Sequence, residues 1–114
     1  HAEAVSAVGW SADGKWVVSG GWDDVLKIWN TETGQARTLR GHTDDLTVLA
    51  LSAKGERMVS ASDDRTVRVW DLRTGKLRQT LRGHTAAVIS LAISPDGRRA
   101  VSGSKNELKF WELK

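Results

Sequence analysis

A tryptophan recurs at a constant interval along this chain of 114 residues and divides it into three similar units. Trp29, Trp70 and Trp111 stand 41 residues apart, and a histidine and a serine recur at nearly the same interval. A repeat of about 40 to 45 residues with Gly-His near one end and Trp-Asp near the other is typical of a four-stranded β-sheet unit. Such a unit cannot bury its apolar face alone, so neighbouring units are expected to stack and form the core together.

Each unit consists of short segments in which apolar and polar residues alternate between turn residues, which is the pattern of β-strands. The first strand of each unit is apolar enough to be buried on both faces. A turn ending in glycine follows each first strand and predicts a hairpin. The predicted strands are Val5–Trp10, Trp16–Gly20, Val25–Trp29 and Gln35–Leu39, then Leu46–Leu51, Arg57–Ala61, Thr66–Trp70 and Lys76–Leu81, then Val88–Ile93, Arg99–Gly103 and Leu108–Trp111.

A fourth strand is predicted only in the first two units, because only three residues follow Trp111. The chain is therefore predicted to be all-β, with antiparallel four-stranded sheets arranged as the blades of a propeller. Blade one is assigned to residues 1–40, blade two to 41–82 and blade three to 83–114, with the outermost strand of blade three missing.

The second unit carries the most specific motif of the chain. It starts at Gly41-His42 and continues through Ser60-Ala-Ser-Asp-Asp-Arg-Thr-Val-Arg-Val-Trp70-Asp71, and Gly83-His84 follows. With this motif the chain resembles the WD-repeat β-propeller family, and the resemblance covers essentially all of it. In that family a buried, hydrogen-bonded tetrad of Asp, His, Ser and Trp ties the loop before the first strand to the second and third strands.

The resemblance assigns the tetrads by position, as structural groups and not as catalysts. The first unit supplies His1, Ser19, Asp23 and Trp29, and the second supplies His42, Ser60, Asp64 and Trp70. The third unit has His84, Ser102 and Trp111, but its turn Ser104–Glu107 is one residue shorter and no aspartate stands six positions before Trp111. This tetrad is expected to be incomplete, with Glu107 and Asn106 as candidate substitutes, and His84 is expected to be held less firmly than His42.

The histidines and the adjacent aspartate pairs of this sequence are not expected to bind a metal or to catalyse a reaction. The three histidines occupy equivalent positions in different blades, which argues against a shared metal site. The adjacent pairs Asp23-Asp24, Asp44-Asp45 and Asp63-Asp64 are read as turn residues, because neighbouring side chains in a turn usually point apart and cannot work as an acid/base pair. The chain has no phosphate-binding glycine loop, His-Glu-x-x-His motif or nucleophile elbow. We therefore expect no enzyme activity, cofactor or metal.

Binding remains as the expected function, and the family resemblance implies where it takes place. The implied face is formed by the loops before the first strand and between the second and third strands. The candidate partner-binding residues on these loops are Trp22, Asp24, Asp44, Asp45, Asp63, Arg65, Lys105, Asn106 and Glu107. Trp22 is either an anchor for a protein or peptide partner or a filler between blades. Trp10 is expected in the core, and Trp16 at an outward position.

Two other functions stay open. A net charge of +3, from 17 basic and 14 acidic residues interspersed along the chain, makes nucleic-acid or polyanion binding an unfavoured alternative. The basic residues of the outer strands are read as protection against edge-to-edge aggregation. The second alternative is a structural or engineered propeller fragment that has no ligand.

Three blades cannot close a ring, because propellers contain about 4 to 8 blades. We expect the ring to be completed either by the remaining blades of a longer parent chain or by other copies of this chain, giving six or nine blades in total. No apolar run approaches the roughly 20 residues that span a bilayer, and no membrane partner is expected. The absence of cysteine is compatible with a cytoplasmic location.

Overall fold

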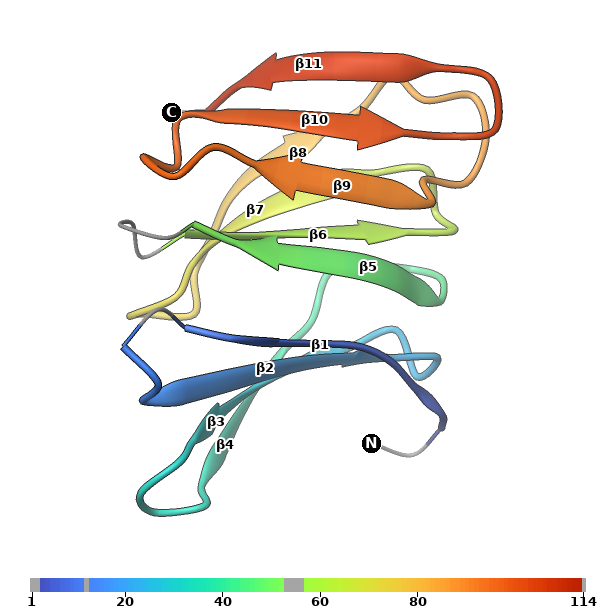
Figure 1. Ribbon diagram of the computed structural model, residues 1–114. Coiled ribbons are helices and arrows are strands. Elements are labelled where there is room, and N and C mark those ends of the chain that lie inside the picture. Colours follow the sequence, from blue (N-terminus) through green and yellow to red (C-terminus); the bar gives the residue numbers. More distant parts are fainter. Residues whose placement is uncertain (1–2, 12, 53–56, 114) are drawn as a thin grey trace.

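A computed structural model describes residues 3–11, 13–52 and 57–113, and all regular structure in these ranges is β-strand. In the described ranges, eleven strands form three separate antiparallel sheets that follow one another along the chain (Figure 1). The described residues include no helix that is long and apolar enough to span a membrane. The predicted all-β class with propeller-blade sheets is confirmed.

Each sheet is built from strands that are consecutive in sequence. Blade one has the order β1 (Val5–Trp10), β2 (Trp16–Gly21), β3 (Leu26–Asn30) and β4 (Ala36–Leu39). Blade two has the order β5 (Leu46–Leu51), β6 (Arg57–Ser62), β7 (Val67–Asp71) and β8 (Leu77–Leu81). Blade three contains only β9 (Ser90–Ile93), β10 (Arg99–Gly103) and β11 (Leu108–Glu112), with β10 in the middle. The predicted absence of a fourth strand in this sheet is therefore found in the described residues.

The predicted bounds agree with the observed ones for β1, β5 and β10, and they differ by one or two residues for the other strands. The largest shift is in β9, which begins at Ser90 instead of Val88. The Val88 amide donates to the Ser62 carbonyl of blade two at 3.4 Å, so the chain at this point is bound to the neighbouring sheet. The predicted turns after β1 and β9 have the expected glycine backbone, since Gly14 and Gly97 both have a φ of 74°. The predicted turn after β5, which ends at Gly55, lies outside the described residues.

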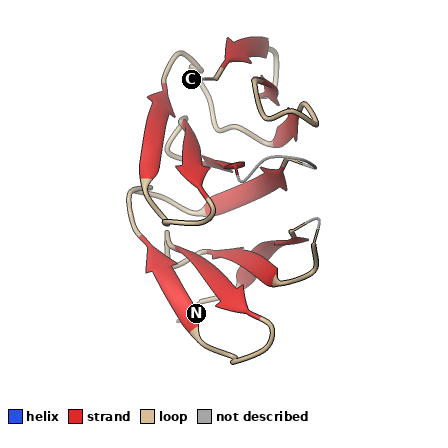
Figure 2. Ribbon diagram, turned by 90° about the vertical axis from the view of Figure 1, so that its left-hand side faces the viewer, coloured by secondary structure: helices blue, strands red, loops and turns tan. Residues whose placement is uncertain are grey.

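The core lies between the sheets and not within any one of them. The first cluster joins side chains of blades one and two, and the second joins side chains of blades two and three. Figure 2 shows the strands and loops of the three sheets from the side. The clusters repeat position by position, so that Val18, Leu26 and Ile28 of blade one are matched by Val59, Val67 and Val69 of blade two. The sheet of blade two thus has a rear face that packs on blade one and a forward face that packs on blade three.

Two tryptophans lie elsewhere than expected, because burial here depends on the neighbouring sheet. Trp10 was expected in the core, but it is 66% exposed. Its counterparts Leu51 and Ile93 pack on a preceding blade, whereas no sheet formed by the described residues covers the rear face of β1. Trp16 was expected to point outward, but it is partly buried against the first cluster. The expectation that first strands are buried on both faces is likewise wrong for β1.

A prediction follows for the first cluster. Met58 is fully buried between blades one and two, so Met58→Ala should lower the free energy of unfolding by about 2 to 5 kcal/mol. Leu77→Ala, on the outer strand where the side chain is 41% exposed, should cost less than about 1 kcal/mol. Urea unfolding at one fixed protein concentration measures both. Equal losses for the two variants would contradict a core located between the sheets.

Candidate functional site

The loops that carry the candidate residues lie along one edge of the structure. The turns from β2 to β3, from β6 to β7 and from β10 to β11 share this edge with the loops that lead into β5 and β9 (the right-hand side of Figure 1). In an antiparallel sheet, alternate turns fall at the same end of the strands, which places these loops together. We call this the loop edge. It has an inner layer of buried, hydrogen-bonded groups and an outer layer of side chains that face the solvent.

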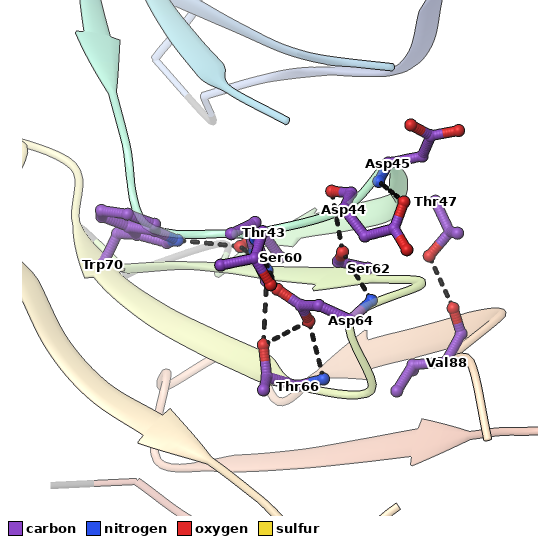
Figure 3. A network of polar contacts seen from close by, with 11 residues as sticks. Thr43, Asp44, Asp45, Thr47, Ser60, Ser62, Asp64, Thr66, Trp70 and Val88 are labelled. Carbon is purple, nitrogen blue, oxygen red and sulfur yellow. Dashed lines mark hydrogen bonds and ion pairs between the residues drawn. The ribbon is translucent and has the colours of Figure 1, made fainter. Parts of the chain in front are cut away.

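Blade two contains a continuous chain of hydrogen bonds from the loop to the third strand (Figure 3). His42 Nδ1 lies 2.8 Å from Asp64 Oδ2, and His42 Nε2 lies 2.8 Å from Ser60 Oγ. Trp70 Nε1 donates to the same Ser60 oxygen at 2.8 Å. The carboxylate can only accept, so Nδ1 of His42 carries the proton and Nε2 accepts from the Ser60 hydroxyl. Every group of this tetrad therefore has a partner.

The electrostatics of the tetrad favour an ionised aspartate beside a neutral histidine. Burial opposes the charge on Asp64, but hydrogen bonds from Thr66, His42 and Thr43 outweigh it and lower its pKa to about 2. The Thr66 hydroxyl donates to Asp64 Oδ1 at 2.6 Å. Burial lowers the pKa of His42, against the opposing attraction of Asp64. Ser60 is fully buried, so a substrate cannot reach its hydroxyl, and the set acts as a clamp on the loop.

The equivalent groups of blade one are only partly described. Trp29 Nε1 donates to Ser19 Oγ at 2.9 Å, the same contact as in blade two. Asp23 lies in the turn from β2 to β3, at the position of Asp64. His1, assigned to this tetrad from the sequence, lies outside the described residues.

Blade three keeps the serine contacts of the tetrad but not the carboxylate. His84 Nε2 lies 2.6 Å from Ser102 Oγ, and Trp111 Nε1 donates to the same oxygen at 2.7 Å. His84 Nδ1 is buried and has no hydrogen-bond partner among the described residues. Glu107 instead accepts from the Thr85 amide at 3.4 Å and from its hydroxyl at 3.1 Å. The shorter turn brings Glu107 to the loop backbone, and Asn106 is exposed.

The charges of blade three follow from this arrangement. The hydrogen bonds from Thr85 lower the pKa of Glu107. Burial lowers the pKa of His84, although Glu107 attracts its charged form. An unpaired buried nitrogen costs roughly 1 to 3 kcal/mol, so this histidine is held at an energetic disadvantage relative to His42.

The exposed side chains of the loop edge include one aromatic ring and a group of carboxylates. Trp22 is 54% exposed at the turn from β2 to β3. Carboxylate oxygens of Asp24, Asp44 and Asp45 lie within 4.8 Å of one another, although Asp24 belongs to blade one and the other two to blade two. Burial and the carboxylates of Asp45 and Asp44 raise the pKa of Asp24, and burial and the same neighbours raise that of Asp63. This part of the edge is therefore locally negative.

The charge changes along the edge toward blade three. Arg65 is exposed and has a φ of 73°, close to the 68° of Asp24 at the equivalent position. Lys105 is exposed in the shorter turn of blade three. The candidate residues therefore form one edge with an acidic part around Asp24, Asp44 and Asp45 and a part that carries the basic side chains Arg65 and Lys105. The loop backbone is similar in the first two blades.

The structure also shows hydrogen bonds between blades that the sequence did not suggest. Ser6 Oγ donates to the Leu46 carbonyl at 2.5 Å, and Thr47 Oγ1 donates to the Val88 carbonyl at 2.6 Å. Ser6 and Thr47 are 41 residues apart, so the repeat itself was the available signal. The equivalent position in blade three is Ile89, which cannot donate. Arg57 makes a further link by donating from Nη1 to the Gly97 carbonyl at 3.2 Å.

Comparisons with known proteins agree with this geometry. A family model described as "WD domain, G-beta repeat" (WD40) matches residues 1–30, 34–71 and 75–112. The second and third matches each begin with the outer strand of one sheet and end with the third strand of the next, so one sequence repeat spans two blades. No curated protein matches the chain significantly. A solved structure of U3-55K is 30% identical with a TM-score of 0.89, covering 99% of this chain and 35% of that one.

A turn exchange tests the incomplete tetrad of blade three. Replacing Ser104–Glu107 with the five residues Ser-Asp-Asp-Arg-Thr of blade two places an aspartate six positions before the tryptophan. The carboxylate should pair with His84 Nδ1, stabilise the protein by about 1 kcal/mol and slow amide hydrogen exchange around His84. The control exchange, Ser-Asp-Asn-Arg-Thr, lacks the carboxylate. An equal gain for both exchanges would show that loop length, and not the missing partner, limits His84.

The lowered pKa of Asp64 predicts how stability depends on pH. A fall from the ordinary 3.8 to about 2 stabilises the fold by roughly 2 kcal/mol at neutral pH. The contribution is complete above the unfolded-state pKa and is lost as the pH falls from about 4 to 2. Unfolding free energies measured across this range should therefore decline less steeply for Asp64→Asn than for the original chain. The exposed carboxyl variant Glu32→Gln should follow the original chain, and parallel curves for all three proteins would refute the assignment.

Proposed function

Because this chain belongs to the WD-repeat (WD40) family, whose propellers generally bind proteins, we propose that it is a non-catalytic scaffold whose loop edge binds a protein or peptide. The buried tetrad of blade two holds this edge in place, since the Asp64 carboxylate ties the loop to the strands. The chain spans about a third of the length of the U3-55K structure that it matches.

The single observation that carries this proposal is the placement of Trp22. An exposed tryptophan offers a large, rigid apolar surface with an N–H donor, and tryptophan is enriched among residues that dominate binding energy. The ring belongs to the same turn as Asp24, whose carboxylate lies with those of Asp44 and Asp45. A partner that pairs an apolar contact with lysine or arginine side chains would cover the ring and relieve the repulsion among the carboxylates. We infer a basic peptide segment as the partner chemistry.

The ring that presents this edge requires more blades than the three described. They come either from other copies of this chain or from the rest of a longer parent chain. In both cases the loop edges of all blades lie on one face of the ring, because every blade repeats the same turns.

The loop edge is tested by substitution of Trp22. Trp22→Ala should weaken capture of the partner at least tenfold and leave the unfolding midpoint unchanged, whereas Trp22→Phe should retain most of the binding. Leu77→Ala serves as the control for loss of an exposed apolar residue away from the edge. The partner is first recovered by a pull-down from native extract, carried out with and without nuclease. The affinity of each variant is then measured by titration with the recovered partner.

The outcomes of this experiment separate the functions that the sequence left open. Collapse of the fold in Trp22→Ala would make Trp22 a packing residue and remove the anchor. Capture that disappears with nuclease and falls steeply with salt would replace the scaffold with a nucleic-acid binder. Capture of nothing by the original chain would favour a propeller fragment without a ligand.

A further inference from the structure

A small cavity lies between blades one and two, toward the side of the molecule opposite to the loop edge. It is near the turns that join β3 to β4 and β7 to β8, on the left-hand side of Figure 1. Its volume is about 170 Å³. Blades one and two supply the whole lining, so the cavity does not depend on any structure beyond the two ends of the described chain. The lining combines apolar and polar side chains, which include Trp16, Ile28, Leu72, Asn30, Gln35 and Arg37.

The apolar side chains of the cavity form its floor and one wall. Ile28 and Leu72 are buried in the first cluster, and Trp16 packs against the same cluster while staying partly exposed. An apolar cavity of about 150 Å³ is large enough to bind benzene. The space between the two blades is therefore large enough for a single ring. Ligand sites commonly join such apolar walls to a few polar groups that fix the orientation of the ligand.

The charged side chain of the lining, Arg37, is held in place by blade two. Arg37 Nη1 donates to the Arg73 carbonyl at 3.2 Å. A Cβ at Gly75 would lie only 2.8 Å from Arg37 Cδ, so the arginine crosses the turn of blade two at a point where glycine leaves room for it. No carboxylate among the described residues forms an ion pair with Arg37. The guanidinium is therefore positioned at the cavity, but its charge is not balanced.

Blade two shows which group is missing beside Arg37. Arg78 stands 41 residues after Arg37, and Asp71 stands 41 residues after Asn30. Arg78 Nη1 lies 3.7 Å from Asp71 Oδ2. Asn30 and Asp71 make the same contacts within their turns, since Oδ1 of each accepts from the amides two and three residues later. Asparagine at position 30 thus keeps the turn but lacks the carboxylate that would pair with the arginine.

The aromatic wall also distinguishes this junction from the next one. Trp16 holds the position of Arg57, which donates to the Gly97 carbonyl of blade three at 3.2 Å. The first junction therefore has an indole ring where the second has a basic side chain that links two blades. An apolar wall and an unbalanced guanidinium thus occur together at the first junction.

We propose that this cavity binds a small monocarboxylate that carries one ring. The carboxylate of the ligand takes the place beside Arg37 that Asp71 occupies beside Arg78. Arg37 has further N–H donors for it after the bond to the Arg73 carbonyl. The ring enters between Trp16 and the buried floor, where the indole offers an aromatic surface for stacking or edge contact. The site is separate from the loop edge, so the proposal goes beyond the binding of a protein or peptide there.

A titration followed by the indole N–H signal of Trp16 in NMR spectra tests the site. The signal is assigned by its loss in Trp16→Phe. Phenylacetate should shift it saturably, whereas phenylacetamide, which has the same shape without the charge, should bind about fivefold more weakly because it cannot pair with Arg37. Acetate should also bind more weakly than phenylacetate, because it buries no ring.

Two substitutions examine the pairing of the carboxylate with Arg37. Arg37→Gln removes the positive charge, and Asn30→Asp supplies the carboxylate that blade two already has. In both variants the affinity for phenylacetate should fall about fivefold, to that for phenylacetamide. Arg78→Gln, the same change 41 residues further along the chain, should leave the affinity unchanged. Circular dichroism confirms that each variant is folded.

Three results would overturn the proposal. They are the absence of a saturable shift with phenylacetate, equal affinities for phenylacetate and phenylacetamide in the original chain, and an unchanged preference for phenylacetate in Arg37→Gln. Binding at Trp22 is measured separately and with a different partner, so failure here leaves the loop-edge proposal intact.

Discussion

Packing of one sheet against the next is the interaction on which the structure depends. A four-stranded sheet has two faces, and a blade has no other layer of its own to cover them. The two clusters show the solution, since residues such as Met58 and Val59 are adjacent in sequence but belong to different cores. Successive side chains of a strand point to opposite faces, so one strand serves two interfaces. The faces of a blade are therefore buried by its neighbours, and the core of the described residues lies between the sheets.

The buried histidine–serine–tryptophan groups fix the positions of the loops more than they add to the free energy of unfolding. Hydrogen bonds contribute only about 1 kcal/mol each, but an unpaired buried partner costs more, so the set strongly disfavours other loop positions. In blade two the ionised Asp64 accepts from the backbone amides of Thr43 and Thr66 and thereby fixes the loops on either side. In blade three Glu107 reaches Thr85 from a shorter turn and leaves His84 Nδ1 without a partner. The loop edge is therefore held by different contacts in blades two and three, whose turns between the second and third strands differ in length by one residue.

The sequence predicted the strands well because the alternation of residues and the 41-residue period report local structure directly. Burial was predicted less well, because it depends on which sheet lies opposite. Trp10 and Trp16 are equally apolar, yet the first is exposed on a free face and the second packs on a cluster. The contact between Asp24 and Asp44 was also hidden, because it joins two blades and neither turn shows it alone.

The repeated backbone and the varied side chains of the loop edge have different roles. Asp24 and Arg65 share the left-handed backbone at the same turn position, with φ values of 68° and 73°, but carry opposite charges. The turn conformation therefore does not require either charge at this position. The negative charge of Asp24 is unfavourable where it stands, because burial and the neighbouring carboxylates destabilise the ionised form and raise its pKa. A group held in an unfavourable charge state on a rigid surface gains most when an opposite charge arrives, which makes the acidic half of the edge the more selective one.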